Sequence, residues 1–218
     1  MKTVLLAAAL AASFGTAHAR NQSFDGIAGV IDTDTDGNVE MNGVSVTVRG
    51  RVGGWVDLNG ASVDVEADVG GDVDLNGASV EFTGSAGGRT EVNAGGTTLD
   101  GTFSGPVEVN AGRATLRGVY EGPVEINMGS VRLEGRFAAP VEIRGEGRGG
   151  LFRRGDRSRV EVSGPLEQGG RICAHEVEFG WGASVGGELL VIADSPPEFV
   201  DGETLEGVRY EPREDERC

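Results

Sequence analysis

Asparagine returns at a constant interval of 17 residues through the middle of this 218-residue chain. This interval is a multiple of neither the helical period of 3.6 residues nor the coiled-coil heptad. A fixed period without insertion or deletion is typical of repeat architectures, in which each unit packs against the units before and after it. The six positions are Asn42, Asn59, Asn76, Asn93, Asn110 and Asn127.

Apolar and polar residues alternate on both sides of each asparagine. Around Asn59, the apolar residues are Val56 and Leu58 before it and Val63 and Val65 after it, with opposite parity. This alternation is typical of β-strands with one buried face. Glycines recur at two further places in each unit, where they allow the chain to bend into the next strand. We therefore expect an all-β protein, a single parallel β-helix or β-solenoid with 17-residue turns and about 9–10 turns.

Residues 17 apart should lie directly above one another in such a fold, about 4.8 Å apart. The six asparagines are therefore predicted to form a structural ladder, each side-chain amide bonding to that of the next turn. A column two residues before the asparagines should face outward and carries negative charge: Glu40, Asp57, Asp74, Glu91, Glu108, Glu125 and Glu142. Another column, Phe103, Tyr120 and Phe137, should be an inward aromatic stack, or a carbohydrate platform if it faces water.

Residues 1–19 are predicted to be a removed signal peptide. One lysine precedes an apolar run, and the segment ends in Ala-His-Ala, the small-x-small pattern before a signal peptidase cut. The apolar run is too short to cross a bilayer, and no longer one follows, so we expect no membrane span. The remaining protein should be periplasmic or secreted from a bacterium.

The rest of the chain divides into three parts by its pattern. We expect an N-terminal cap over residues 20–36, the solenoid over 37–193, and an acidic C-terminal tail or cap over 194–218. The seventh repeat loses its asparagine, and an arginine-rich insertion is predicted over residues 144–159.

Composition excludes some partners. The chain has 35 acidic against 19 basic residues, a net charge of −16, which suits neither nucleic acid nor anionic lipid. Its two cysteines, Cys173 and Cys218, should pair in an oxidising compartment and hold the C-terminal tail, although Cys218 could also bond to another molecule.

The repeated pattern V-x-[LIV]-x-G-x-x-V-x-[VL]-x-G, from about residue 37 to residue 193, resembles the bactofilins, a family of polymer-forming bacterial proteins. The resemblance implies a right-handed parallel β-helix whose copies join end to end into filaments without a nucleotide. The chain departs from most bactofilins in its secretory signal, its asparagine ladder and its long acidic tail.

One segment has the pattern of a metal site. In "DTDTDGNVE", Asp32, Asp34 and Asp36 precede a glycine, as in the first half of a calcium-binding loop. The final glutamate of an EF-hand is missing, so the alternative is a solvated acidic entry to the first turn. No cofactor other than Ca²⁺ is suggested.

A second candidate site is the basic group in the insertion: Arg144, Arg148, Arg153, Arg154, Arg157 and Arg159. It could bind a phosphate, a carboxylated glycan of the cell envelope, or an acidic tail, with a solvated loop as the alternative. His175, beside Glu176 in the strand-like segment "CAHEVEF", has no nucleophile motif around it and is expected to be structural.

These observations favour a non-enzymatic structural or interaction protein outside the cytoplasm, a solenoid scaffold that can self-associate through its ends. A glycan- or calcium-binding surface module is the alternative. A polysaccharide-acting enzyme is the third hypothesis, and no catalytic residues are predicted.

Overall fold

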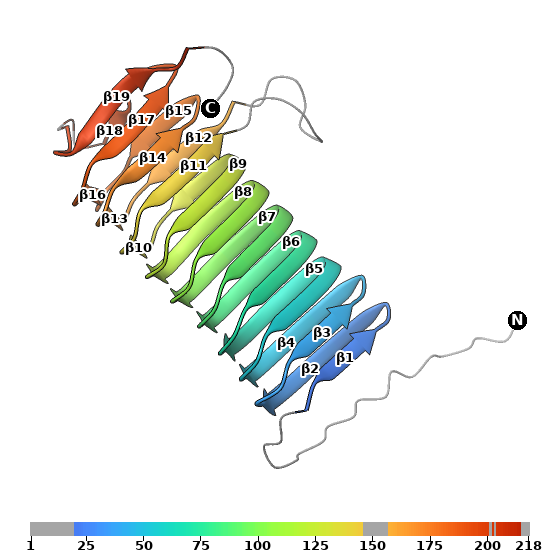
Figure 1. The fold of residues 1–218 in the computed structure, drawn as a ribbon. Helices are drawn as coiled ribbons and strands as arrows, with labels where there is room; N and C mark the ends of the chain where they lie inside the picture. Colours follow the sequence, from blue (N-terminus) through green and yellow to red (C-terminus); the bar gives the residue numbers. More distant parts are fainter. Residues whose placement is uncertain (1–19, 146–156, 201, 203, 215–218) are drawn as a thin grey trace, which may run out of the picture.

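The computed structural model describes residues 20–145, 157–200, 202 and 204–214. These residues form one parallel sheet of 19 strands, wound into a β-solenoid of about 10 turns (Figure 1), so the predicted fold class is confirmed. None of them belongs to a helix that could cross a membrane. The first strands are β1 (Gln22–Asp25), β2 (Ala28–Thr35), β3 (Val39–Asn42), β4 (Ser45–Val52), β5 (Val56–Val69), β6 (Val73–Ala86), β7 (Thr90–Phe103), β8 (Val107–Tyr120) and β9 (Val124–Leu133). The later strands are β10 (Arg136–Phe137), β11 (Val141–Gly145), β12 (Arg159–Val162), β13 (Pro165–Leu166), β14 (Gly170–Cys173), β15 (Glu176–Phe179), β16 (Ser184–Val185), β17 (Leu189–Ala193), β18 (Glu198–Phe199) and β19 (Val208–Pro212).

The strands pair in the register that the 17-residue period predicts. Val56 lies beside Val73 between β5 and β6, and Val73 lies beside Thr90 between β6 and β7. The offset grows to 29 where Ser130 of β9 pairs with Arg159 of β12. The extra 12 residues locate the predicted insertion between β11 and β12, whereas Arg144 and Arg159 themselves lie in strands.

Each regular coil bends at three places. The first bend follows the asparagine: the ladder between β5 and β6 skips Ala61, whose N–H and that of Ser62 both donate to the Val44 carbonyl, at 3.0 and 2.9 Å. This bend explains why the buried residues switch from odd to even positions, counted from the asparagine, after it. The second bend has a glycine with positive φ in most of these coils, for example Gly118 at +91°, whereas Ala67 occupies this position in β5. The third is the connection between successive long strands.

The inward columns form one continuous hydrophobic core along the stack. One column of the core consists of large aromatic side chains. Tyr120 is fully buried, and its ring stacks on Phe103 and Phe137 with centroids 4.8 Å apart on both sides. The predicted inward aromatic stack is therefore confirmed. The Tyr120 hydroxyl donates to the Leu99 carbonyl oxygen at 3.0 Å, so its polar atom is satisfied inside the core.

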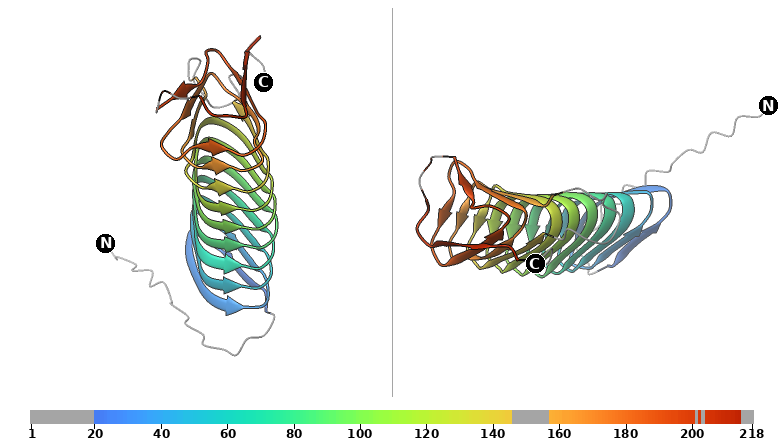
Figure 2. Two further views of the ribbon diagram at one scale, coloured as in Figure 1. Left: turned by 90° about the vertical axis from the view of Figure 1, so that its left-hand side faces the viewer. Right: turned by 90° about the horizontal axis from the view of Figure 1, so that it is seen from above.

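The predicted boundaries of the solenoid were too narrow at both ends. Residues 22–35 are not a separate cap, because β1 pairs with β3 and β2 pairs with β4 in the same 17-residue register. At the other end, β18 pairs with β15 and β19 pairs with β17, so the solenoid continues to Pro212. Figure 2 shows β1 and β2 as the outermost layer at one end and the β18 and β19 region at the other.

Candidate functional site

The six asparagines stand in one file on the outer face of the stack. Asn59 pairs with both Asn42 and Asn76, and the register continues through Asn93, Asn110 and Asn127. All six side chains are half-buried. The predicted register of the asparagine ladder is confirmed.

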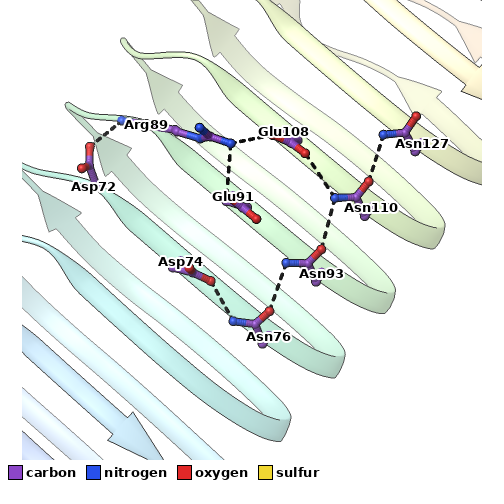
Figure 3. A network of polar contacts seen from close by, with 9 residues as sticks. All are labelled: Asp72, Asp74, Asn76, Arg89, Glu91, Asn93, Glu108, Asn110 and Asn127. Carbon is purple, nitrogen blue, oxygen red and sulfur yellow. Dashed lines mark hydrogen bonds and ion pairs between the residues drawn. The ribbon is translucent and has the colours of Figure 1, made fainter.

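Four of the asparagines form a continuous hydrogen-bond ladder (Figure 3). The Nδ2 of Asn127 donates to the Oδ1 of Asn110 at 2.9 Å, Asn110 donates to Asn93 at 3.1 Å, and Asn93 donates to Asn76 at 3.0 Å. The last amide, of Asn76, donates to the Asp74 carboxylate at 2.7 Å. All four bonds run in one direction and end on a negative charge, an arrangement in which each bond polarises the next.

The ladder does not extend to the first two asparagines, contrary to prediction. The Asn59 Nδ2 donates instead to Asp57 of its own coil, at 2.8 Å, and no side-chain amide bond joins Asn42 to Asn59 among the described residues. The acidic column explains the difference. Asp57 and Asp74 have short side chains that place a carboxylate next to the asparagine two residues later, whereas the later coils carry glutamate.

Two arginines neutralise much of the acidic column. Arg89 lies 3.1 Å from Glu91 and 2.6 Å from Glu108, and Figure 3 shows it between these carboxylates. Arg144 lies 2.9 Å from Glu125 and 2.7 Å from the glutamate of its own coil. These side chains are about one-third to one-half exposed, so each pair contributes little stability on its own. Together they lower the repulsion between carboxylates stacked in one column.

The predicted calcium loop is wrong in its geometry. Asp32 and Asp34 lie on β2, with side chains exposed to solvent, and not on a tight turn. Asp34 and Asp36 lie 3.5 and 3.3 Å from the guanidinium of Arg51. Among the described residues, no group of three acidic, histidine or cysteine side chains could hold a metal ion. The regular strand register positions these aspartates for ion pairs instead.

The predicted anion-binding arginines are only partly described. Arg148, Arg153 and Arg154 lie outside the described residues. Arg144 is paired with two glutamates, and its hydrogen bond to Glu142 raises the guanidinium pKa. Arg157 lies 3.7 Å from Glu176, and Arg159 lies 3.6 and 3.8 Å from Glu176 and Glu178. The described members of this group are therefore engaged with the protein's own carboxylates.

The disulfide prediction concerns one described cysteine. Cys173 ends β14 and is buried. Cys218 lies outside the described residues, so its pairing with Cys173 stays a prediction.

The N-terminal edge, which we define as β1 and β2, is formed by residues that the sequence analysis assigned to a cap. Among the described residues, no strand pairs with β1 or β2 on the side away from β3 and β4. The edge therefore presents unpaired backbone groups along 4 residues of β1 and 8 of β2. The 17-residue period already indicated a coil here, because Asp25 falls at the asparagine position and Phe24 at the inward position before it.

Apolar side chains accompany this open edge. Ile27 is 79% exposed, and Val30 and Val44 are 55% and 56% exposed. Inside the coil, the ring of Phe24 lies where Cβ atoms of Gly26 and Gly29 would be, so the two glycines let the ring fold over the end of the core. The core is thus partly covered, while no other described residue covers the strand edge or the flanking apolar side chains.

The opposite end of the stack offers a less regular edge. The outermost strands there are β16 and β18, of 2 residues each, and β19, of 5 residues. β19 carries Arg209 and Glu211 on one face and ends at Pro212, which has no N–H to donate. Short strands, charges and proline are the features that protect edges from pairing.

Neither a protein-family model, nor a curated protein, nor a solved structure matches this chain.

Proposed function

We propose that this protein is a non-enzymatic structural or interaction protein outside the cytoplasm, a β-solenoid scaffold that self-associates through its ends. The observation that carries this proposal is the open N-terminal edge. Twelve strand residues present one unpaired side of their backbone there, and Ile27, Val30 and Val44 expose apolar surface beside it. An uncovered strand edge of this kind is a template for pairing with another chain.

Two further observations agree with the proposal. The signal-like residues 1–19 support export, after which Arg20 and Asn21 alone would precede β1. The resemblance to the bactofilins supports polymerisation, because members of that family join end to end. The net charge of −16 opposes association, so we expect assembly to strengthen with salt, which screens repulsion between copies.

The alternative of a calcium- or glycan-binding module has less support. The aspartates of the calcium hypothesis are ion-paired or exposed on a strand, and the described arginines of the glycan hypothesis contact glutamates. We therefore propose no second function.

Replacing Val30 by lysine tests the proposal. Val30 lies in the middle of β2, and a lysine there would place a charge on the pairing edge while removing apolar area. We expect the dissociation constant of self-association to rise at least about tenfold, equivalent to about 1.4 kcal/mol. Static light scattering across a protein concentration series, at two salt concentrations, measures it.

Thr115→Lys is the matched control. Thr115 occupies the same outward column in the middle of the stack, so the variant gains the same charge away from either end. It should associate like the unmodified protein. A purified protein that stays monomeric throughout the series, or a Val30→Lys variant that associates like the control, would contradict the proposal.

A further inference from the structure

The column two residues after the asparagine changes character along the stack. It is apolar or glycine in the regular coils: Ile27, Val44, Ala61, Ala78, Gly95, Gly112 and Gly129. Beyond the insertion, the same corner is occupied by polar residues that share hydrogen bonds or ion pairs from coil to coil: Ser158, His175, Asp194 and Arg213. We call these four residues the polar column. It joins the last coils of the solenoid, where strands are short and irregular.

Ser158 and His175 are held together by reciprocal hydrogen bonds. The Ser158 backbone N–H donates to Nδ1 of His175 at 3.0 Å, and the Ser158 Oγ lies 2.7 Å from the same nitrogen. In return, the backbone N–H of His175 donates to the Ser158 Oγ at 3.0 Å. Ser158 is 1% exposed and His175 is half-buried, so the Ser158 groups have little access to water as an alternative partner.

This geometry defines the protonation state of the imidazole. A backbone N–H can only donate, so the Nδ1 of His175 must present its lone pair, and the ring proton must lie on Nε2. A second proton would have to go onto Nδ1. It would then point at the Ser158 N–H, so the bond from that N–H would be lost, and the bond to the Ser158 Oγ would have to reverse, with Nδ1–H donating to the hydroxyl oxygen.

The charges around the ring act in both directions. Burial lowers the His175 pKa most, and Arg213 and Arg157 lower it further, whereas Asp194 and Glu176 raise it. Arg213 is the most constrained of these groups. Its side chain is 3% exposed, its Nη1 lies 3.6 Å from Asp194, and its Nε and Nη1 have no hydrogen-bond partner. A protonated His175 would add a positive charge beside this buried guanidinium.

We propose that Ser158 and His175 form a pH-sensitive clasp, which holds the C-terminal coils closed at neutral pH and loosens them when the imidazole takes up a proton. The clasp acts on the whole end because the polar column continues from it. The Asp194 N–H donates to the His175 carbonyl at 3.2 Å, and the Arg213 N–H donates to the Ala193 carbonyl at 3.0 Å. Opening at His175 therefore releases contacts of β15, β17 and β19 together.

The sign of the pH dependence follows from the direction of the shift. Because the His175 pKa is lowered in the folded state, the closed form binds fewer protons than the open form below the ordinary value of about 6.5. The clasp is fully effective above that pH and is lost progressively as the pH falls through the folded-state pKa. For one proton, the opening equilibrium rises by at most about tenfold per pH unit in this window.

Amide hydrogen exchange followed by NMR tests the proposal on the purified protein. Protection factors, corrected for the intrinsic exchange rate, are measured between pH 7 and 5.5 for the amides of His175, Glu176 and Asp194. Amides of β6 to β8 serve as the internal reference. The ¹⁵N shifts of the imidazole report the tautomer and the pKa, and the chain contains one other histidine, His18.

His175→Asn is the matched variant. The Oδ1 of asparagine can accept the Ser158 N–H in place of Nδ1 but does not titrate, so this variant keeps the acceptor without the switch. We expect protection at the three amides to fall several-fold, and at most about tenfold, per pH unit below 6.5 in the unmodified protein and to stay level in His175→Asn. The His175 signal should show the Nε2–H tautomer with a pKa below 6.5. Equal pH dependence in the two proteins, or an imidazole that titrates at or above its ordinary value, would overturn the clasp.

Discussion

Replacing Tyr120 by alanine is expected to lower the free energy of unfolding by about 3–5 kcal/mol. The side chain is fully buried between Phe103 and Phe137, which lie too far apart to close the gap without moving whole coils. The loss combines the apolar area of the ring with the cavity that remains. Equilibrium denaturation followed by far-UV circular dichroism measures the change.

Tyr120→Phe is the control for this experiment. It keeps the ring stack and removes only the hydroxyl, which donates to the Leu99 carbonyl. We expect a loss of about 1 kcal/mol, because one satisfied hydrogen bond is removed without a cavity. If alanine and phenylalanine at position 120 cost the same, the aromatic column would not support the core as described.

The second large effect is expected for Gly118→Ala. Gly118 adopts a φ of +91° at the second bend of its coil, and a Cβ there would collide with the carbonyl oxygen of Gly101 in the coil below. Backbone strain of this kind costs about 1–3 kcal/mol, and the collision adds to it because the neighbouring atom is backbone and cannot rotate away. We expect a loss of about 2–4 kcal/mol in the same denaturation assay.

Gly96→Ala is the matched change at a permissive glycine. An added Cβ at Gly96 meets no atom within 4 Å, and serine occupies the same column in neighbouring coils, as at Ser62 and Ser79. Its effect should stay within about 1 kcal/mol and can be stabilising, because alanine restricts the unfolded chain more than glycine does. Equal losses at positions 96 and 118 would contradict the stacked geometry of the bends.

The period made most of the fold predictable from the sequence. Once Asn59 and Asn76 are known to stack, every other residue of their coils has a fixed neighbour, and the inward position of Tyr120 follows from its parity. Repetition thus replaces the long-range information that a single sequence usually lacks. The side-chain ladder was harder to predict, because Asp57 and Asp74 compete for the asparagine amides within their own coils.

The ends of the stack were predicted less well for a physical reason. A terminal coil has one neighbour, so its residues deviate from the core pattern even when its backbone continues the register. Gln22 and Gly29 occupy inward positions that are valine in the next coil, and residues 20–36 therefore resembled a separate cap. The motif of Asp32, Asp34 and Asp36 suggested a loop, yet the pairing of β2 with β4 extends this segment into a strand.

The Ser158–His175 clasp could not be assigned from the sequence. These residues are 17 apart, like any stacked pair, but the 12-residue insertion interrupts the 17-residue repeat just before Ser158. Without the strand pairing, nothing in the sequence indicates at which residue the repeat resumes.

Deleting one complete coil tests the central claim, that 17 residues make one turn and equivalent residues stack. Removal of residues 65–81 joins Asp64 to Phe82, the residue that already lies beside Val65 in the next coil. The shortened protein should keep the circular dichroism spectrum of a β-protein and a cooperative unfolding transition. Removal of residues 65–82, one more, leaves a coil one residue too short to close and should abolish that transition. If both deletions unfold alike, the 17-residue turn is contradicted.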